Sequence, residues 1–298
     1  MRKVKVITDS CADISAELLN KYDLDYAKMS THCDGVESPA RLEWTWDEIH
    51  AFYQSIRDGK RITTSQVSVE EFERIFKLYL EQGYDIVYVA CSTKQSGSVN
   101  TASMVAKRML ADYPDAEIDC IDSKNTSSGE GMLAIEAAKK AAEGMSAAEI
   151  TKYILSILKT PNEYCTVHSL DQLKRAGRVT ASKAFFGNLM GVKPIIIADA
   201  VGAQAAYAKA KGRAKSLRMI VDLLKESIVD SENQTLYIAH ADCPKEEVEM
   251  VRSMMEAEIP CKEIVIGSIG PIVGASVGPD AIAIFGFGKP VTFCGDDK

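Results

Sequence analysis

Small hydroxyl side chains follow a short apolar run in the first half of the chain. The run 86–90, IVYVA, leads into CSTKQSGS at 91–98, and a stretch with helical periodicity follows. A strand that opens a helix in this way leaves free backbone N–H groups at the helix start, where the helix dipole favours an anion. Gly97 permits close approach of a ligand, and Ser96 or Ser98 can donate a hydroxyl or cap the helix. The segment is a candidate anion site, with an ordinary helix cap as the alternative.

A second run of uncharged polar residues lies at 63–68, where the sequence reads TTSQVS. Ser68, followed three residues later by Glu71, fits a capping box at the start of an amphipathic helix. That cap accounts for Ser68 but leaves Thr64–Gln66 unexplained. These side chains either satisfy local turns or line a polar pocket, and the residues alone do not separate the two interpretations.

A third segment, at 269–279, is rich in glycine and proline and reads IGPIVGASVGP. Such a segment is rigid, lets another group approach its backbone, and offers apolar walls with one hydroxyl at Ser276. It is a candidate wall of a binding site, and a crossover between strands is the structural alternative.

Enzymatic use of these segments is the competing hypothesis. Phosphoryl transfer is disfavoured because the chain has no G-x-x-x-x-G-K-[ST] motif, and Lys94 alone would face a nucleotide's phosphates. Ser96 and Gly97 lack the preceding glycine of a hydrolase G-x-S-x-G turn. His240 ends a predicted strand and could act as a base, although a structural histidine is more common there. A hydrolase or acyltransferase that uses Ser96 with His240 on a small anionic or acyl substrate is therefore the alternative function.

Composition describes a globular protein with no strongly basic surface. The 298 residues are 46% hydrophobic and 26% charged, enough for two α/β domains with buried cores. A net charge of −7 and a pI near 5.3 argue against nucleic acid as a partner. The chain starts without the apolar region of a signal peptide, and no segment reaches the length of a membrane span. We therefore expect a cytoplasmic protein.

The eight cysteines form no CxxC pair and show no zinc-type spacing with the four histidines. Most lie in or beside apolar runs, which is typical of small buried side chains in a reducing compartment. The sequence therefore predicts no metal site.

Strand-like runs alternate with helical stretches in the first half. Apolar runs at 4–8, 86–91 and 118–122 each precede a stretch of helical period, which indicates βαβ units and a mainly parallel sheet. Each run ends in a small polar turn, and ligands collect beyond the carboxyl ends of such strands. We expect the three turns to share one edge of the sheet.

The sequence of the second half of the chain predicts a mixed sheet instead of a mainly parallel one. Strands are expected at 164–167, 236–240, 264–266 and 282–285, with a short helix at 170–175 and a hairpin of 194–198 with 203–207, which indicates mixed pairing. A turn near Thr160 marks the boundary. The predicted fold is α/β with two α/β domains, 1–160 with a mainly parallel sheet and 161–298 with a mixed sheet.

Seven motifs, read together in order, resemble the DegV family of bacterial fatty-acid-binding proteins over nearly the whole chain. Each motif alone is weak, but seven in register are specific. They are ITDS at 7–10, TSQ at 64–66, SGS at 96–98, DS at 122–123 with SGEG at 128–131, LDQLKRAGRV at 170–179, HAD at 240–242, and the segment from IGP at 269–271 to GP at 278–279.

The resemblance implies a carrier and not an enzyme. Family members hold one fatty acid in a tunnel between two α/β domains, with no other cofactor. They act as the carrier subunit of a fatty acid kinase system and present the acid to a separate ATP-using protein, which makes acyl phosphate for phospholipid synthesis. The expected partners are thus a long-chain fatty acid, a fatty acid kinase subunit and, transiently, a membrane. A carrier that senses lipid without a kinase partner is a third hypothesis.

The resemblance also assigns site residues. Thr64 and Ser96 match the family's carboxylate ligands, and Gly97 would supply a backbone N–H. Ser276 stands where the family typically has a histidine, so the third carboxylate partner is shorter and uncharged here. The segment 29–60 matches the family poorly and is expected to reshape the tunnel mouth. Residues expected at the site edge or at a partner contact are Asp9, Ser10, Ser65, Arg178 and Gly274.

The lipid interpretation is consistent with simple energetics. At about 0.8 kcal/mol per buried CH₂, ten to fourteen methylenes contribute about 8 to 11 kcal/mol before the cost of association. The tail would therefore dominate affinity. A few neutral donors, at about 1.5 to 3 kcal/mol each, need only offset desolvation of the carboxylate and fix its direction.

Overall fold

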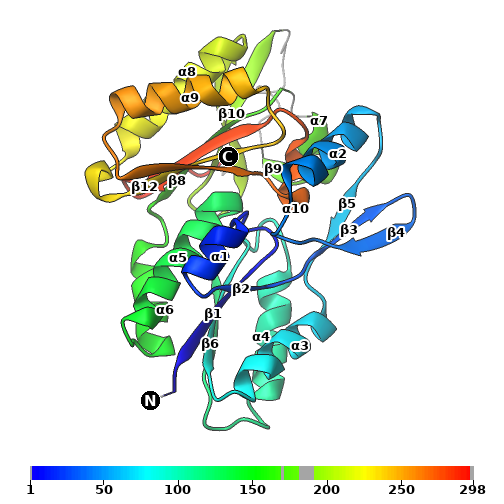
Figure 1. The fold of residues 1–298 in the computed structure, drawn as a ribbon, viewed down its shortest axis with the longest axis vertical. Coiled ribbons are helices and arrows are strands. Elements are labelled where there is room, and N and C mark those ends of the chain that lie inside the picture. The colour runs from blue at the N-terminus through cyan, green and yellow to red at the C-terminus, as the bar shows by residue number, and fades with distance from the viewer. Residues whose placement is uncertain (1, 169–170, 181–190, 296–298) are drawn as a thin grey trace.

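Buried apolar runs in the first half of the chain pair into a four-stranded parallel sheet. The computed structural model describes residues 2–168, 171–180 and 191–295, and it shows two stacked α/β lobes (Figure 1). The lower sheet has the order β2-β1-β6-β7 with every pair parallel, as predicted. Its strands are β1 (Val4–Asp9), β2 (Asp25–Ala27), β6 (Asp85–Ala90) and β7 (Ile118–Asp122).

Helices cover both faces of this sheet. Phe72 of α3 packs against Tyr88 on one face, whereas Leu133 of α5 and Ile150 of α6 pack with Val87 on the other. Alternating side chains of β6 therefore face opposite helical layers. The helices of this lobe are α1 (Ala16–Lys21), α3 (Val69–Leu80), α4 (Ser98–Met109), α5 (Ser127–Ala142) and α6 (Ala147–Ile157).

A small antiparallel sheet and one helix leave the first lobe and reach the second. The sheet has the order β4-β3-β5 and comprises β3 (Ser30–Cys33), β4 (Val36–Pro39) and β5 (Thr63–Ser65). Helix α2 (Trp46–Arg57) begins at Thr45 with a complete capping box. Its apolar face, with Ile49 and Tyr53, packs into a cluster made largely of residues from the second lobe.

The second lobe contains the mixed sheet that the sequence predicts. The strand order is β13-β12-β14-β8-β10-β11-β9, with β12–β13 and β11–β9 parallel and the other pairs antiparallel. The predicted boundary at residue 160 falls between α6 and β8. The strands are β8 (Pro161–Thr166), β9 (Val179–Thr180), β10 (Val192–Ala198), β11 (Gln204–Lys211), β12 (Thr235–His240), β13 (Glu263–Ser268) and β14 (Ile282–Phe287).

Side chains alternate between the two faces of this sheet. Ile238 and Ile284 pack under α8 and α9, whereas Ala239 and Phe285 face the cluster that holds α2. Leu170, which the sequence places in a short helix, lies outside the described residues. No helix in the described part of the chain is long and apolar enough to cross a membrane. The helices here are α7 (Asp171–Ala176), α8 (Arg213–Ser227), α9 (Lys245–Glu258) and α10 (Pro271–Val277), with a 3₁₀ turn at Ser231–Asn233.

Candidate ligand-binding site

A cavity of about 400 Å³ lies between the two lobes at the carboxyl end of the parallel sheet. Its lining residues come from the turn after β6 and from β5, α7, α10 and the start of β11. Five of the predicted site residues line it, and they are Thr64, Ser96, Gly97, Arg178 and Ser276. Apolar lining comes from Leu173, Ile272, Val273 and Val277. The cavity therefore combines a polar turn with apolar walls.

The turn at 91–98 leaves backbone donors open. Ser96 Oγ accepts the N–H of Ser98 at 3.2 Å and lies 2.9 Å from its hydroxyl. Gly97 is the N-cap of α4, and no side chain caps this helix. Among the described residues, the backbone N–H groups of Gly97 and Val99 donate no hydrogen bond. Free N–H groups at a helix start beside a hydroxyl suit a carboxylate or another anion.

Two neighbouring polar side chains of strand β5 point in different directions. Thr64 lines the cavity. Ser65 does not, and its hydroxyl lies 2.6 Å from Nε2 of His32. The next residue, Gln66, donates to Thr101 at 2.7 Å, and its amide oxygen would lie 2.1 Å from a Cβ at position 97. The glycine at 97 thus makes room for Gln66 as well as for a ligand.

The glycine- and proline-rich segment, which the sequence offers as a wall of a binding site or as a crossover between strands, forms helix α10. Pro271 occupies the first turn of α10, a position that tolerates its missing N–H. Ser276 lines the cavity. Gly274 faces α2 instead, and a Cβ there would lie 2.4 Å from Oη of Tyr53. Gly274 therefore serves helix packing and not the cavity wall.

Asp9 and Ser10 lie beneath the cavity and not on its wall. Both are fully buried. Asp9 accepts the N–H of Cys11 at 2.9 Å and the hydroxyl of Tyr88 at 2.7 Å. Ser10 donates to the carbonyl of Ala40 at 2.7 Å. The two side chains hold the turn after β1 in place.

Arg178 lies at the exposed rim of the cavity. It also lines a neighbouring pocket together with Thr64 and Ser276. One guanidinium N–H donates to the carbonyl of Ala176. The side chain of Arg178 therefore caps a backbone carbonyl and also lies at the edge of the cavity.

The hydrolase arrangement of Ser96 with His240 is not formed. The hydroxyl of Ser96 has hydrogen bonds only to Ser98 among the described residues. His240 lies away from the cavity wall, stacked on Trp46 with ring centroids 5.1 Å apart. Its Nδ1 accepts the N–H of Cys243 at 3.3 Å, and burial lowers its pKa. No general base therefore reaches Ser96 in the described part of the chain.

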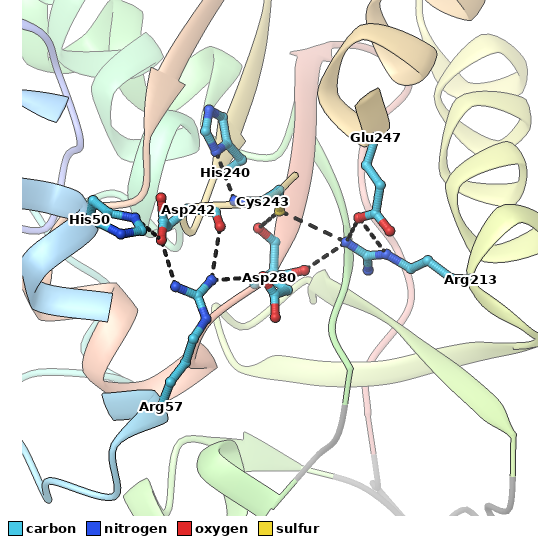
Figure 2. A network of polar contacts seen from close by, with 9 residues as sticks. His50, Arg57, Arg213, His240, Asp242, Cys243, Glu247 and Asp280 are labelled. Carbon is cyan, nitrogen blue, oxygen red and sulfur yellow. Dashed lines mark hydrogen bonds and ion pairs between the residues drawn. The ribbon is translucent and has the colours of Figure 1, made fainter. Parts of the chain in front are cut away.

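Sequence reasoning missed the polar network that fastens α2 to the second lobe. Figure 2 shows Arg57 between Asp242 and Asp280, with N–O distances of 2.6 and 2.8 Å. His50 lies 2.9 Å from the same carboxylate of Asp242. Asp242 and Asp280 lie 185 and 223 positions from Arg57 in the chain. In the sequence, only the motif HAD at 240–242 drew attention to this region.

Carboxyl groups beneath and beside the cavity are enclosed by protein. Burial raises the pKa of Asp13 to about 7, and that of Glu163 to about 7. Asp13 accepts the backbone N–H of Gly270 at 2.8 Å and thereby joins the two lobes. Glu163 accepts from Gln204 at 3.0 Å.

Comparison with known proteins finds one family across the chain. A family model described as uncharacterised proteins of the DegV family matches residues 3–289. A DegV domain-containing protein from Clostridium perfringens is 34% identical over 298 residues, which cover 100% of this chain and 99% of that protein.

Two solved structures are similar at 26% identity. A DegV lipid-binding protein from Thermotoga maritima superposes with a TM-score of 0.83 and covers 95% of this chain and 97% of its own. A stearic-acid-binding protein from Eubacterium ventriosum superposes with a TM-score of 0.82, over 96% of this chain and 98% of its own.

Proposed function

This chain belongs to the DegV family, and from that premise we propose that it binds a long-chain fatty acid in the cavity between its lobes. The carboxylate would accept from the hydroxyls of Thr64, Ser96 and Ser276 and from the free N–H of Gly97. The tail would run along the apolar wall. Its methylenes supply most of the affinity, and the neutral donors fix which end faces out.

One observation carries the proposal. The same cavity is lined by the hydroxyl residues Thr64, Ser96 and Ser276 and by the apolar side chains of Ile272 and Val273. Apolar walls beside the hydroxyls match an amphiphilic acid better than a phosphate, which has no apolar part to bury. Lys94 and Arg178 also line the cavity, and their charge suits either anion. Because no base reaches Ser96 among the described residues, the proposal assigns this serine to binding and not to catalysis.

The proposal extends to handover of the bound acid. Thr93, Lys94 and Arg178 are exposed at the polar end of the cavity, so a second protein could reach the carboxylate there. We propose a separate kinase subunit as that partner. The chain itself would need no cofactor beyond the bound acid.

Uptake of labelled oleate by delipidated protein tests the binding site. Ser96→Ala should weaken binding about tenfold or more, because a hydrogen bond to a charged group contributes about 1.5 to 3 kcal/mol. Ser103→Ala is the control, since Ser103 lies on α4, the helix that follows Ser96, and its hydroxyl donates to the carbonyl of Val99. Equal affinity of the two variants would overturn the assignment. Addition of the host's kinase subunit and ATP then tests handover separately.

A further inference from the structure

Two cysteines and a glutamate that are far apart in the sequence meet beneath the cavity floor. Cys11 follows β1, Cys91 follows β6, and Glu130 lies in the first turn of α5. Their sulfur atoms and one carboxylate oxygen all lie within 4.8 Å of one another. The residues are 3%, 1% and 0% exposed, respectively. Both cysteines also line the cavity, so the cluster adjoins it.

The backbone around the two sulfur atoms is fixed by a shared partner. One carboxylate oxygen of Asp9 accepts the N–H of Cys11 at 2.9 Å, and the other accepts the N–H of Cys91 at 3.1 Å. The carbonyl of Cys11 accepts the N–H of Ser127 at 2.8 Å. Such outer contacts hold ligand atoms in place before a metal ion arrives.

Glu130 has an unused oxygen in the protein interior. Its Oε1 accepts the hydroxyl of Thr8 at 2.8 Å, whereas Oε2 is buried without a donor from another residue type among the described residues, and the carboxyl adjoins that of Asp9. No lysine or arginine in the described part of the chain forms an ion pair with Glu130 or Asp9. A bare carboxylate in such a place is costly unless a proton or a cation offsets it.

We propose that Cys11, Cys91 and Glu130 bind a thiophilic divalent cation of the Zn²⁺ class. Two sulfur ligands and one carboxylate oxygen suit Zn²⁺ or Cd²⁺, whereas Mg²⁺ and Ca²⁺ prefer oxygen ligands alone. The fourth position faces the cavity and is available to water or to an oxygen of a bound ligand. The site stands independently of the proposed fatty-acid function.

Binding must release protons. The hydrogen bond between the thiols and burial raise the pKa of Cys11 well above its usual value. The same bond lowers the pKa of Cys91, but burial raises it overall to about 12. Burial and the nearby Asp9 raise the pKa of Glu130. Because the metal binds the thiolate form, each metal–sulfur bond releases the proton of its thiol to solvent.

Cadmium titration of delipidated, reduced protein tests the site, because a Cd–thiolate bond absorbs in the ultraviolet. The parent should bind one tight equivalent, with an affinity at least tenfold above that of Cys11→Ser and Cys91→Ser. Cys165→Ser is the matched control, since Cys165 is equally buried but lies in the second-lobe core, and it should bind like the parent. No tight equivalent in the parent, or equal binding by all variants, would overturn the proposal.

A second measurement needs no variant. One equivalent of Cd²⁺ should slow alkylation of Cys11 and Cys91 in the parent, as read by peptide mass spectrometry, and leave exposed Cys294 unchanged. Protection of Cys294 instead would place the metal on the surface and refute the buried site.

Discussion

Asp9 and Cys91 are joined by a hydrogen bond of 3.1 Å from the backbone N–H of Cys91 to Oδ2 of the carboxylate. Asp9 ends β1 and Cys91 follows β6, the adjacent strand of the parallel sheet. The bond therefore fixes the turn that carries Ser96 relative to the end of β1. The first motif of the chain, ITDS, thus positions the third, SGS, although the side chain of Asp9 does not line the cavity.

Asp9→Asn should destabilise the protein by about 1 to 3 kcal/mol, because an amide NH₂ cannot accept the N–H that the second oxygen accepts. Chemical denaturation at neutral pH measures the change. Exposed Asp112→Asn provides the control and should stay within about 0.5 kcal/mol of the parent. A variant of Asp9 as stable as this control would show that the contact is dispensable.

Thr64→Val should weaken fatty-acid binding about tenfold or more while leaving stability nearly unchanged, since it removes a hydroxyl from the cavity wall. Ser65→Ala on the same strand should bind like the parent, because Ser65 contacts His32 instead. Titration of both variants with labelled oleate makes the comparison. Similar losses of fatty-acid affinity in the two variants would contradict the assignment of Thr64 to the cavity wall.

Asp13→Asn should flatten the pH dependence of stability. The folded-state pKa of Asp13 is about 7 because of burial, above its usual value of 3.8. The folded state therefore holds a proton that the unfolded chain has released, and stability falls as pH rises from about 4 to 7. Unfolding midpoints at pH 5 and pH 8 should differ less in the variant than in the parent. An unchanged difference, equal to that of exposed Asp115→Asn, would contradict this account.

Arg57→Ala should loosen helix α2 from the second lobe (Figure 2). Removal of the guanidinium leaves the partly buried carboxylates of Asp242 and Asp280 without their shared cation. We expect a loss of about 1 to 3 kcal/mol and faster hydrogen exchange in α2. Arg252→Ala removes surface ion pairs within one helix and should cost less than about 1 kcal/mol. Equal effects would show that the network is no more than a surface contact.

The sheets were predictable because their signals are local. The buried run at β6 and the hairpin of β10 with β11 show their periodicity within a few residues, and the polar turns follow from parallel strands. The different roles of Thr64 and Ser65 were not predictable from the sequence. Side chains of a strand alternate between its two faces, but this rule can be applied only once residues 63–65 are known to form strand β5.

Contacts between segments that are distant in the chain could not be predicted from the sequence. Gly274 reads as part of a rigid loop, and only the position of Tyr53 explains why it is a packing residue within a helix. The spacing of cysteines predicts no metal site, but β1 and β6 are neighbours in the sheet and bring Cys11 to Cys91. Topology, and not spacing, creates that cluster.

Native mass spectrometry of the gently purified parent protein distinguishes a fatty-acid carrier from a protein with no lipid ligand. We expect one long-chain fatty acid per chain, released on denaturation and identified by its mass. A protein that emerges empty, and that takes up neither oleate nor palmitate after delipidation, would contradict this expectation.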